Sequence, residues 1–168
     1  MSLTTDPNSQ CLKDGQKESG QNNCYLVLSE EELAKGFVRP VRNKYVHVGR
    51  KVKPLNGIIQ PLEEALENHS DWAKNYYTSE NGYGAFLKYP ESESPVTGKF
   101  LKQDELEALN IGKDYVGGCG IETVMNMSIS ETYARDPKFY GATYCTGCNK
   151  HLPVDEFQWS VDNEILGS

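Results

Sequence analysis

Short apolar runs, separated by glycine, proline and polar residues, indicate where this chain forms regular elements. Runs of β-branched and aromatic residues, in which alternate side chains share one face, predict strands at 24–28, 45–48 and 83–89. Apolar residues at helical spacing, with capping or proline signals at their starts, predict short helices at 29–36, 61–66 and 102–109. Helices and strands are therefore interleaved along the chain.

The strongest helical pattern follows a Gly-Gly-Cys-Gly turn at 117–120. From Ile121 to Tyr133, apolar side chains recur at intervals of three and four residues, which places them on one face of a helix. The pattern ends at Asp136, because Pro137 cannot continue a helix. Two further strands are predicted before and after a Cys-Thr-Gly-Cys turn, at 141–144 and 154–161.

The first 23 residues of the 168-residue chain contain few apolar side chains. A segment of this composition buries too little surface to offset the entropy lost on ordering, so residues 1–23 are predicted to be a disordered tail. Residues 24–168 are predicted to form a single domain, since their number suits one core. Cys11 and Cys24, in and beside the tail, are expected to be free thiols.

The cysteine count and the apolar runs bear on the cellular compartment. No apolar run reaches 18 residues, and the beginning of the chain lacks a basic-then-apolar pattern, so neither a membrane span nor secretion is expected. The five cysteines are an odd number, which makes a disulfide framework the weaker interpretation. We expect a cytoplasmic protein whose thiolates are held by a metal.

Charge is distributed unevenly along the chain. The formal net charge of −7 disfavours general adhesion to nucleic acid or anionic lipid. Between Leu33 and Leu62, however, there are seven basic residues and no acidic residue. The favoured interpretation is that these bases neutralise acidic groups elsewhere in the fold. The alternative is a nucleic-acid-binding segment over 35–53 that uses Arg39, Arg42, Lys44, Arg50 and Lys51.

Three cysteines in the last third of the chain carry the clearest chemical signal. Cys145 and Cys148 form a C-x2-C pair with a glycine inside the turn, a spacing that lets two thiolates bind one metal ion. Cys119, among flexible glycines, can supply a third thiolate. With one histidine, these residues match a tetrahedral Cys3His zinc site. A redox function for the C-x2-C pair is less favoured, because such pairs open a helix and this one does not.

The fourth ligand is open among the three histidines. His47 lies in a predicted strand and approaches from a separate element, which allows tetrahedral geometry with little backbone strain. His151 follows Cys148 by three residues, a tighter spacing than most metal-binding turns use, and is the alternative fourth ligand. His69 lies in a polar stretch and is the weakest candidate. We therefore favour His47.

No catalytic motif accompanies the cysteines. The chain has neither the H-x-E of zinc deaminases nor the H-E-x-x-H of zinc proteases. Four protein ligands leave no position for water, which is the mark of a structural zinc. A metalloenzyme with an open zinc position, held by the three cysteines alone, is the remaining enzymatic alternative.

Part of the sequence resembles a group of uncharacterised small Cys/His proteins encoded by bacteriophage and bacterial genomes. The similar stretches cover about a third of the chain: 131–148, His151-Leu-Pro-Val, Glu156-Phe-Gln-Trp159, 37–42 and Tyr45-Val-His47. The group has no established activity. The resemblance implies a phage or prophage context. It also implies that the cysteines and histidine form a metal-binding set.

Together these patterns predict an α+β fold, in which a small antiparallel sheet with a zinc-ribbon-like hairpin packs against one long helix and several short ones. The favoured function is a non-enzymatic, zinc-stabilised binding or accessory protein that acts on a host protein. A protein partner is favoured over nucleic acid, because the chain as a whole is acidic.

Overall fold

The computed structural model describes residues 2–168 and divides the chain into two compact units. The discontinuous unit contains the chain up to Lys51 together with Tyr115–Ser168, and the inserted unit is Val52–Asp114. The predicted single domain over 24–168 spans parts of both units. Phe86 and Leu101 are buried within the inserted unit and form a core of its own.

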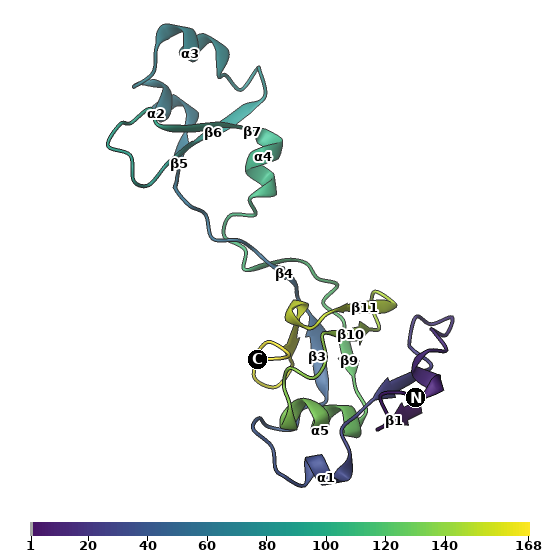
Figure 1. Ribbon diagram of the computed structural model, residues 1–168. Helices are drawn as coiled ribbons and strands as arrows, with labels where there is room; N and C mark the ends of the chain where they lie inside the picture. Colours follow the sequence, from purple (N-terminus) through teal and green to yellow (C-terminus); the bar gives the residue numbers. More distant parts are fainter. Residues whose placement is uncertain (1) are drawn as a thin grey trace. The chain divides into compact units, whose positions relative to one another are not determined.

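The discontinuous unit is built on a three-stranded antiparallel sheet in the order β12-β3-β9. Around this sheet lie three strand pairs, of which only β1-β2 is parallel. Figure 1 shows β3 beside β9, with α5 across the end of the sheet. The bounds of the strands and helices are β1 Ser2–Thr4, β2 Cys24–Leu26, α1 Glu30–Leu33, β3 Lys44–His47, β4 Gly49–Lys51, β8 Tyr115–Gly117, β9 Glu122–Val124, α5 Met127–Arg135, β10 Ala142–Cys145, β11 Lys150–Pro153 and β12 Phe157–Trp159.

Aromatic side chains dominate the core of the discontinuous unit. Phe157 and Trp159 of β12 are buried, and the ring of Tyr45 on β3 packs edge-on against both. Tyr133 of α5 also packs edge to face against Trp159. Edge-to-face packing of this kind adds to the free energy gained by burial. The core therefore holds α5 against the strand that carries Tyr45 and His47.

The predicted long helix is shorter than its apolar pattern. Residues 122–124 form strand β9, paired with β3, and α5 begins only at Met127. Asn126 has an extended backbone, and its side chain accepts a hydrogen bond from the Ser128 N–H, which caps the helix. Val124 is 58% exposed while Thr123 is buried, so burial alternates as in a strand. Pairing with β3 overrides the helical spacing of this segment.

The predicted strand at 154–161 is split. β11 begins directly after the Cys-Thr-Gly-Cys turn and forms an antiparallel hairpin with β10, which pairs Cys145 with Lys150. A 3-10 turn, η2 (Val154–Glu156), then redirects the chain into β12, which pairs with β3 instead. The hairpin and the central sheet are thus joined by a single turn.

The segment predicted to be a disordered tail has structure. β1 pairs with β2, a 3-10 turn η1 spans Gln10–Leu12, and a disulfide joins Cys11 to Cys24, which were expected to be free thiols. The Tyr144 hydroxyl donates a hydrogen bond to the Ser19 carbonyl oxygen, which ties the segment to β10. The amino-acid composition of a segment indicates how much apolar surface it can bury. It does not indicate hydrogen bonds or disulfides to residues outside the segment.

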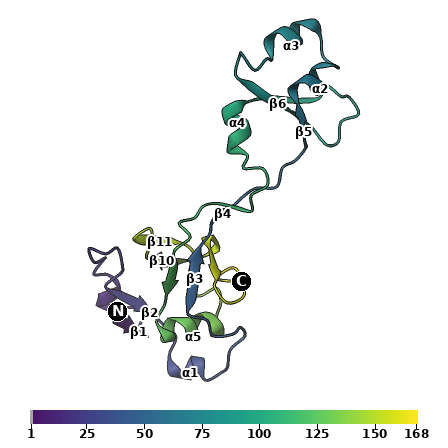
Figure 2. The ribbon, with the colours of Figure 1, turned by 180° about the vertical axis from the view of Figure 1, so that it is seen from behind.

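The inserted unit is a small sheet in the order β5-β6-β7 with three short helices. Phe86 and Leu101 are buried at its centre, together with Ala65, Ala73 and Ala85 from α2, α3 and β6. Figure 2 shows this unit from behind, with α4 beside the sheet. Its elements are β5 Ile58–Pro61, α2 Leu62–Leu66, α3 Asp71–Tyr76, β6 Tyr83–Lys88, β7 Gly98–Lys102 and α4 Gln103–Ala108.

The structure confirms a mixed fold with several small antiparallel sheets and few helices. The predicted strands at 24–28, 45–48 and 83–89 and the short helices at 29–36, 61–66 and 102–109 are all present with shifted ends. Across residues 2–168, no helix combines the length and the apolar character required to traverse a bilayer.

The disulfide leads to a direct chemical prediction. Protein denatured without a reductant, in the presence of a chelator, should show three reactive thiols, those of Cys119, Cys145 and Cys148. A thiol-reactive dye measures this number, and treatment with a reductant should raise it to the five cysteines of the sequence. Five thiols before reduction would show that Cys11 and Cys24 are not joined.

Candidate metal centre

Three cysteines and one histidine converge on one point in the discontinuous unit. One potential ligand atom from each of His47, Cys119, Cys145 and Cys148 lies within 4.8 Å of every other. The Cys119 and Cys145 sulfurs are 3.4 Å apart, and the Cys148 sulfur lies 3.5 Å from His47 Nδ1. This group of four, called here the Cys3His cluster, can bind a metal ion.

The four side chains come from three separate parts of the unit. His47 ends β3 and is buried, because this strand is the centre of the core sheet. Cys145 ends β10, and Cys148 lies in the turn of the β10–β11 hairpin. Cys119 lies between β8 and β9 and is the exposed member of the cluster. A bound ion would therefore link the central sheet, the hairpin and the loop after β8.

Two glycines allow these segments to approach one another. A Cβ atom on Gly147 would lie 2.6 Å from the Cys119 sulfur, and one on Gly118 would lie 2.5 Å from the His47 carbonyl oxygen. Both distances are well below van der Waals contact. The glycines of the Cys-Thr-Gly-Cys and Gly-Gly-Cys-Gly turns thus serve close packing around the cluster.

Backbone N–H groups near the sulfurs affect the pKa values of two thiols. Burial raises the pKa of Cys145, and the N–H groups of Cys148 and Gly147 oppose that rise, while the Ile121 N–H acts to lower the pKa of Cys119. These donors disperse negative charge on a thiolate, as required when three thiolates surround one cation. Asn149 has a φ of 55°, in the left-handed region that asparagine tolerates, and it closes the turn.

Hydrogen bonds to His47 indicate an unprotonated Nδ1, whose lone pair a metal would take in place of the Cys119 N–H. Nδ1 accepts the backbone N–H of Cys119 at 3.2 Å, so this nitrogen carries a lone pair and no proton. The proton then sits on Nε2, which lies 3.1 Å from a carboxylate oxygen of Glu156 and donates to it. Metal-binding histidines characteristically donate their second ring N–H to a carboxylate in this way. Glu156 therefore orients the imidazole toward the cluster.

The size of the Cys3His cluster fits a tetrahedral ion. With bonds of about 2.3 Å to sulfur and about 2.0 Å to nitrogen, a tetrahedral site places sulfurs about 3.8 Å apart and sulfur about 3.5 Å from nitrogen. The sulfur–sulfur and sulfur–nitrogen distances of 3.4 and 3.5 Å are close to these values. The remaining pairs of ligand atoms lie within 4.8 Å of one another, so shifts of up to about 1 Å would complete the geometry.

The two closest thiols have opposed acidities. Burial raises the pKa of Cys145 to about 11. Burial also acts to raise the pKa of Cys119, but hydrogen bonds from the Ile121 N–H and from neighbouring cluster groups outweigh it and lower that pKa to about 7. Because a metal binds thiolates, it must displace the proton of Cys145, and its affinity should rise with pH.

The other two histidines lie outside the cluster. His151, the alternative fourth ligand, lies on β11, where its Nε2 is 2.9 Å from the Tyr25 hydroxyl and its Nδ1 is buried without a partner. Its position one strand residue beyond the turn directs it to the other side of the hairpin from Cys145. His69 lies in the inserted unit, with Nδ1 bonded to the Ala65 carbonyl oxygen. The preference for His47 thus agrees with the geometry.

The basic residues of the 35–53 segment differ in burial and in their partners. Arg42 is 8% exposed, is paired with Asp162 and Glu164 at 2.8 and 3.0 Å, and has its guanidinium 4.9 Å from the Trp159 ring centre. It is held inside the fold and is not free to contact a phosphate. This residue supports the interpretation that the bases neutralise acidic groups elsewhere in the fold.

The remaining candidates for nucleic-acid contact do not form a uniform positive face. Arg39 is exposed, and its Nε donates to the Ser168 carbonyl oxygen; Lys44 is also exposed. Arg50 and Lys51 line a groove of about 510 Å³, but Asp155 and Glu156 line the same groove. Because acidic and basic groups share it, the groove lacks the positive potential that nucleic-acid binding requires.

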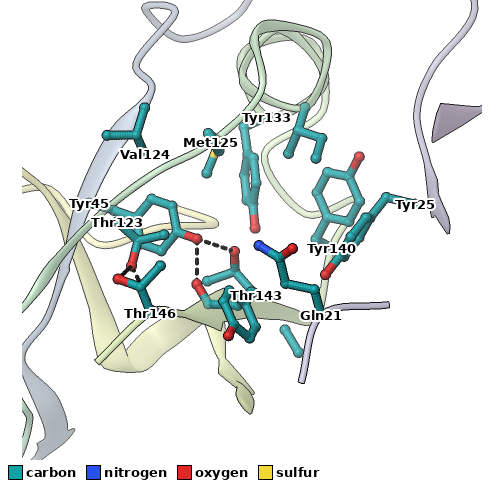
Figure 3. A pocket seen from close by; sticks show the side chains of 13 residues that line it. Gln21, Tyr25, Tyr45, Thr123, Val124, Met125, Tyr133, Tyr140, Thr143 and Thr146 are labelled. Carbon is teal, nitrogen blue, oxygen red and sulfur yellow. Dashed lines mark hydrogen bonds between the residues drawn. The ribbon is translucent and has the colours of Figure 1, made fainter. Parts of the chain in front are cut away.

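A small cavity lies between α5 and the hairpin (Figure 3). Its volume is about 60 Å³, and the rings of Tyr25, Tyr45, Tyr133 and Tyr140 surround the side-chain amide of Gln21. No charged residue lines it. This volume is well below the roughly 300–1,000 Å³ of pockets that enclose small-molecule ligands.

Sequence reasoning missed Glu156 and the packing function of Gly118. Glu156 belongs to one of the stretches that carry the resemblance, but nothing in its spacing from the cysteines points to His47. Their proximity follows from the pairing of β12 with β3, which sets Phe157 opposite His47.

Comparison with known proteins finds no family model, no curated protein and no solved structure that matches the chain. Inference about the site therefore depends on its own geometry.

Gly147→Ala should weaken metal binding about tenfold or more, because the added methyl group would clash with the Cys119 sulfur. Competition with a chromophoric chelator measures the affinity. Gly141→Ala is the matched control, since a Cβ there meets nothing within 4 Å. Equal affinities for the two variants would contradict the close packing of the turn against Cys119.

Glu156→Gln should lower metal affinity by about 10- to 100-fold, because the amide cannot orient and polarise the His47 ring as a carboxylate does. Asp155→Asn removes the neighbouring, exposed carboxylate and should leave the affinity at the wild-type value. The same chelator competition applies. A loss of the same size in both variants would indicate a general charge effect and not the bond to His47.

Proposed function

We propose that this chain is a zinc-stabilised, non-enzymatic binding protein, in which a zinc-ribbon-like hairpin is fixed to the central sheet by one structural ion. The observation that carries the proposal is the convergence of His47 Nδ1 with the sulfurs of Cys119, Cys145 and Cys148. Three thiolates and one imidazole form a donor set that suits Zn²⁺, which accepts both ligand types in tetrahedral geometry.

A structural function is favoured because the protein itself supplies four donors. Catalytic zinc keeps an open position for water or substrate, and such sites have three protein ligands. In the Cys3His cluster His47 is buried and oriented by Glu156, so the fourth donor is preorganised. This argues against the alternative of an open zinc held by the cysteines alone.

Binding to a protein is favoured over binding to nucleic acid. The chain has a formal charge of −7, and Arg42, within the basic segment, is paired with Asp162 and Glu164 of the same chain. The resemblance to phage-encoded Cys/His proteins supports an accessory function directed at a host protein. In this proposal zinc stabilises the fold, and a surface of that fold binds the partner protein.

Removal of the metal tests this proposal. The purified protein should contain one zinc per chain, and chelation should lower its melting temperature by about 10 °C or more, because the ion binds only the folded state. His47→Ala should lose the metal and melt like the chelated protein. Elemental analysis and thermal unfolding by circular dichroism measure both effects.

His151→Ala is the matched histidine variant. It should retain one zinc per chain, because His151 bonds to Tyr25 and lies outside the cluster. Retention of metal by His47→Ala together with its loss in His151→Ala would assign the fourth ligand to the other histidine. A metal-free wild-type protein with the same melting temperature before and after chelation would contradict the proposal.

A further inference from the structure

The inserted unit displays a pair of exposed aromatic rings on α3. Trp72 is 66% exposed and Tyr76 47% exposed, although they are large and partly apolar. Their rings are stacked nearly parallel, with centres 5.2 Å apart and an angle of 8° between the planes. One helical turn separates the two residues, so they lie on the same face of α3. Exposed aromatic surface of this kind marks interaction sites.

The exposed pair is anchored on a rigid base of further rings. Tyr76 packs edge-on against Tyr77, with centres 5.0 Å apart. Tyr77 in turn is stacked on Phe100, with centres 3.9 Å apart, and Phe100 contacts the buried ring of Phe86. Because the pair is held by the core of the unit, little side-chain entropy is lost when a ligand covers it.

The net charge of the inserted unit indicates which kind of ligand the aromatic pair would bind. The inserted unit has eleven acidic residues and six lysines, with no arginine, which gives a formal charge of −5 over Val52–Asp114. Next to the pair in the sequence, Asp71 and Glu80 are exposed, and so is Lys74 between the two rings, so the negative charge belongs to the unit as a whole. Aromatic platforms for single-stranded nucleic acid lie in positively charged grooves, so this charge disfavours nucleic acid. It also disfavours a second copy of the same acidic surface, and it favours a cation.

A cation–π contact already exists inside this unit. The Lys102 ammonium nitrogen lies 5.7 Å from the centre of the Tyr83 ring, and Tyr83 contacts Tyr76. Tyr83 is thus covered by a cation from the same chain, while the faces of Trp72 and Tyr76 are not. Tryptophan is the best aromatic partner for a cation, and a planar guanidinium stacks on it better than an ammonium group does.

We infer that the Trp72–Tyr76 pair is a docking site for an arginine-bearing segment of a partner protein. The guanidinium stacks on the exposed indole, and the net negative charge of the inserted unit attracts the positive charge of the segment. This inference rests on the proposed function, because it names the surface and the partner chemistry of the binding protein. It concerns the inserted unit, however, whereas the metal is proposed for the discontinuous unit.

The test uses full-length, metal-loaded protein and a fluorescent nine-residue peptide of alternating arginine and glycine. Binding is followed by fluorescence anisotropy at 50 mM salt, and a glutamine–glycine peptide of the same length is the control for charge. In the wild type, emission from the exposed Trp72 should respond to the peptide, whereas Trp159 is 1% exposed and should not. We expect the arginine peptide to bind and the glutamine peptide not to bind.

Trp72→Ala should weaken the peptide affinity about tenfold, between the losses expected for an exposed and for a desolvated cation–π contact. Tyr89→Ala is the matched control, because Tyr89 is 44% exposed in the same unit and lies outside the ring cluster. It should bind like the wild type. Trp72→Phe, which keeps an aromatic face, should bind with intermediate affinity.

Several outcomes would overturn the inference. These are no binding by the wild type at millimolar peptide, equal affinities for Trp72→Ala and the wild type, and equal binding of the glutamine peptide. Displacement of the arginine peptide by oligo-deoxythymidine from the Trp72 surface would assign this surface to nucleic acid. Self-association that is lost in Trp72→Ala would assign it to a second copy.

Zinc content is measured in the same samples and separates the two proposals. A zinc-loaded, folded wild type that does not bind the peptide would remove only the docking site. A metal-free wild type would remove the zinc-stabilised fold, whatever the peptide does.

Discussion

The convergence of three cysteine sulfurs and one imidazole nitrogen on a single point is the interaction on which the rest of the discontinuous unit depends. His47 is 72 residues from Cys119 and 101 residues from Cys148, so the cluster joins distant parts of the chain. Structural zinc contributes about 10–16 kcal/mol in small zinc-binding peptides, compared with about 5–15 kcal/mol for the net stability of a typical domain. A cation at this point can therefore supply most of the stability of a unit whose sheets are small.

The core and the cluster are coupled through β3. Tyr45 and His47 are two residues apart on this strand and so face the same side, the first into the aromatic core and the second into the cluster. Phe157, opposite His47 on β12, packs against the imidazole with ring centres 4.9 Å apart, and its neighbour Glu156 bonds to the same ring. Burial of Phe157 and orientation of the metal ligand thus depend on the same strand pairing.

The cysteines of the cluster could be chosen from the sequence because C-x2-C spacing and neighbouring glycines report local geometry. The short strands and capped helices could be predicted for the same reason, as at Ser29, whose side chain accepts the Glu32 N–H as its capping pattern indicates. The strand at 122–124 could not, because its helical spacing competes with pairing to β3, which lies far away in the sequence. Glu156 and the order of the N-terminal segment likewise depend on contacts between distant residues.

The metal cluster and the exposed aromatic pair lie in different units. In the discontinuous unit, the buried imidazole and the glycine turns serve the cluster, and the small tyrosine-lined cavity leaves no room for a substrate. In the inserted unit, ring packing supports aromatic surface that nothing in the described chain covers.

The coordination shell of the bound metal tests the central claim most directly. X-ray absorption at the zinc edge of the purified protein should fit three sulfur ligands at about 2.3 Å and one nitrogen at about 2.0 Å. An oxygen in the shell together with fewer than four protein ligands would contradict the account, as would a protein that binds no metal at all.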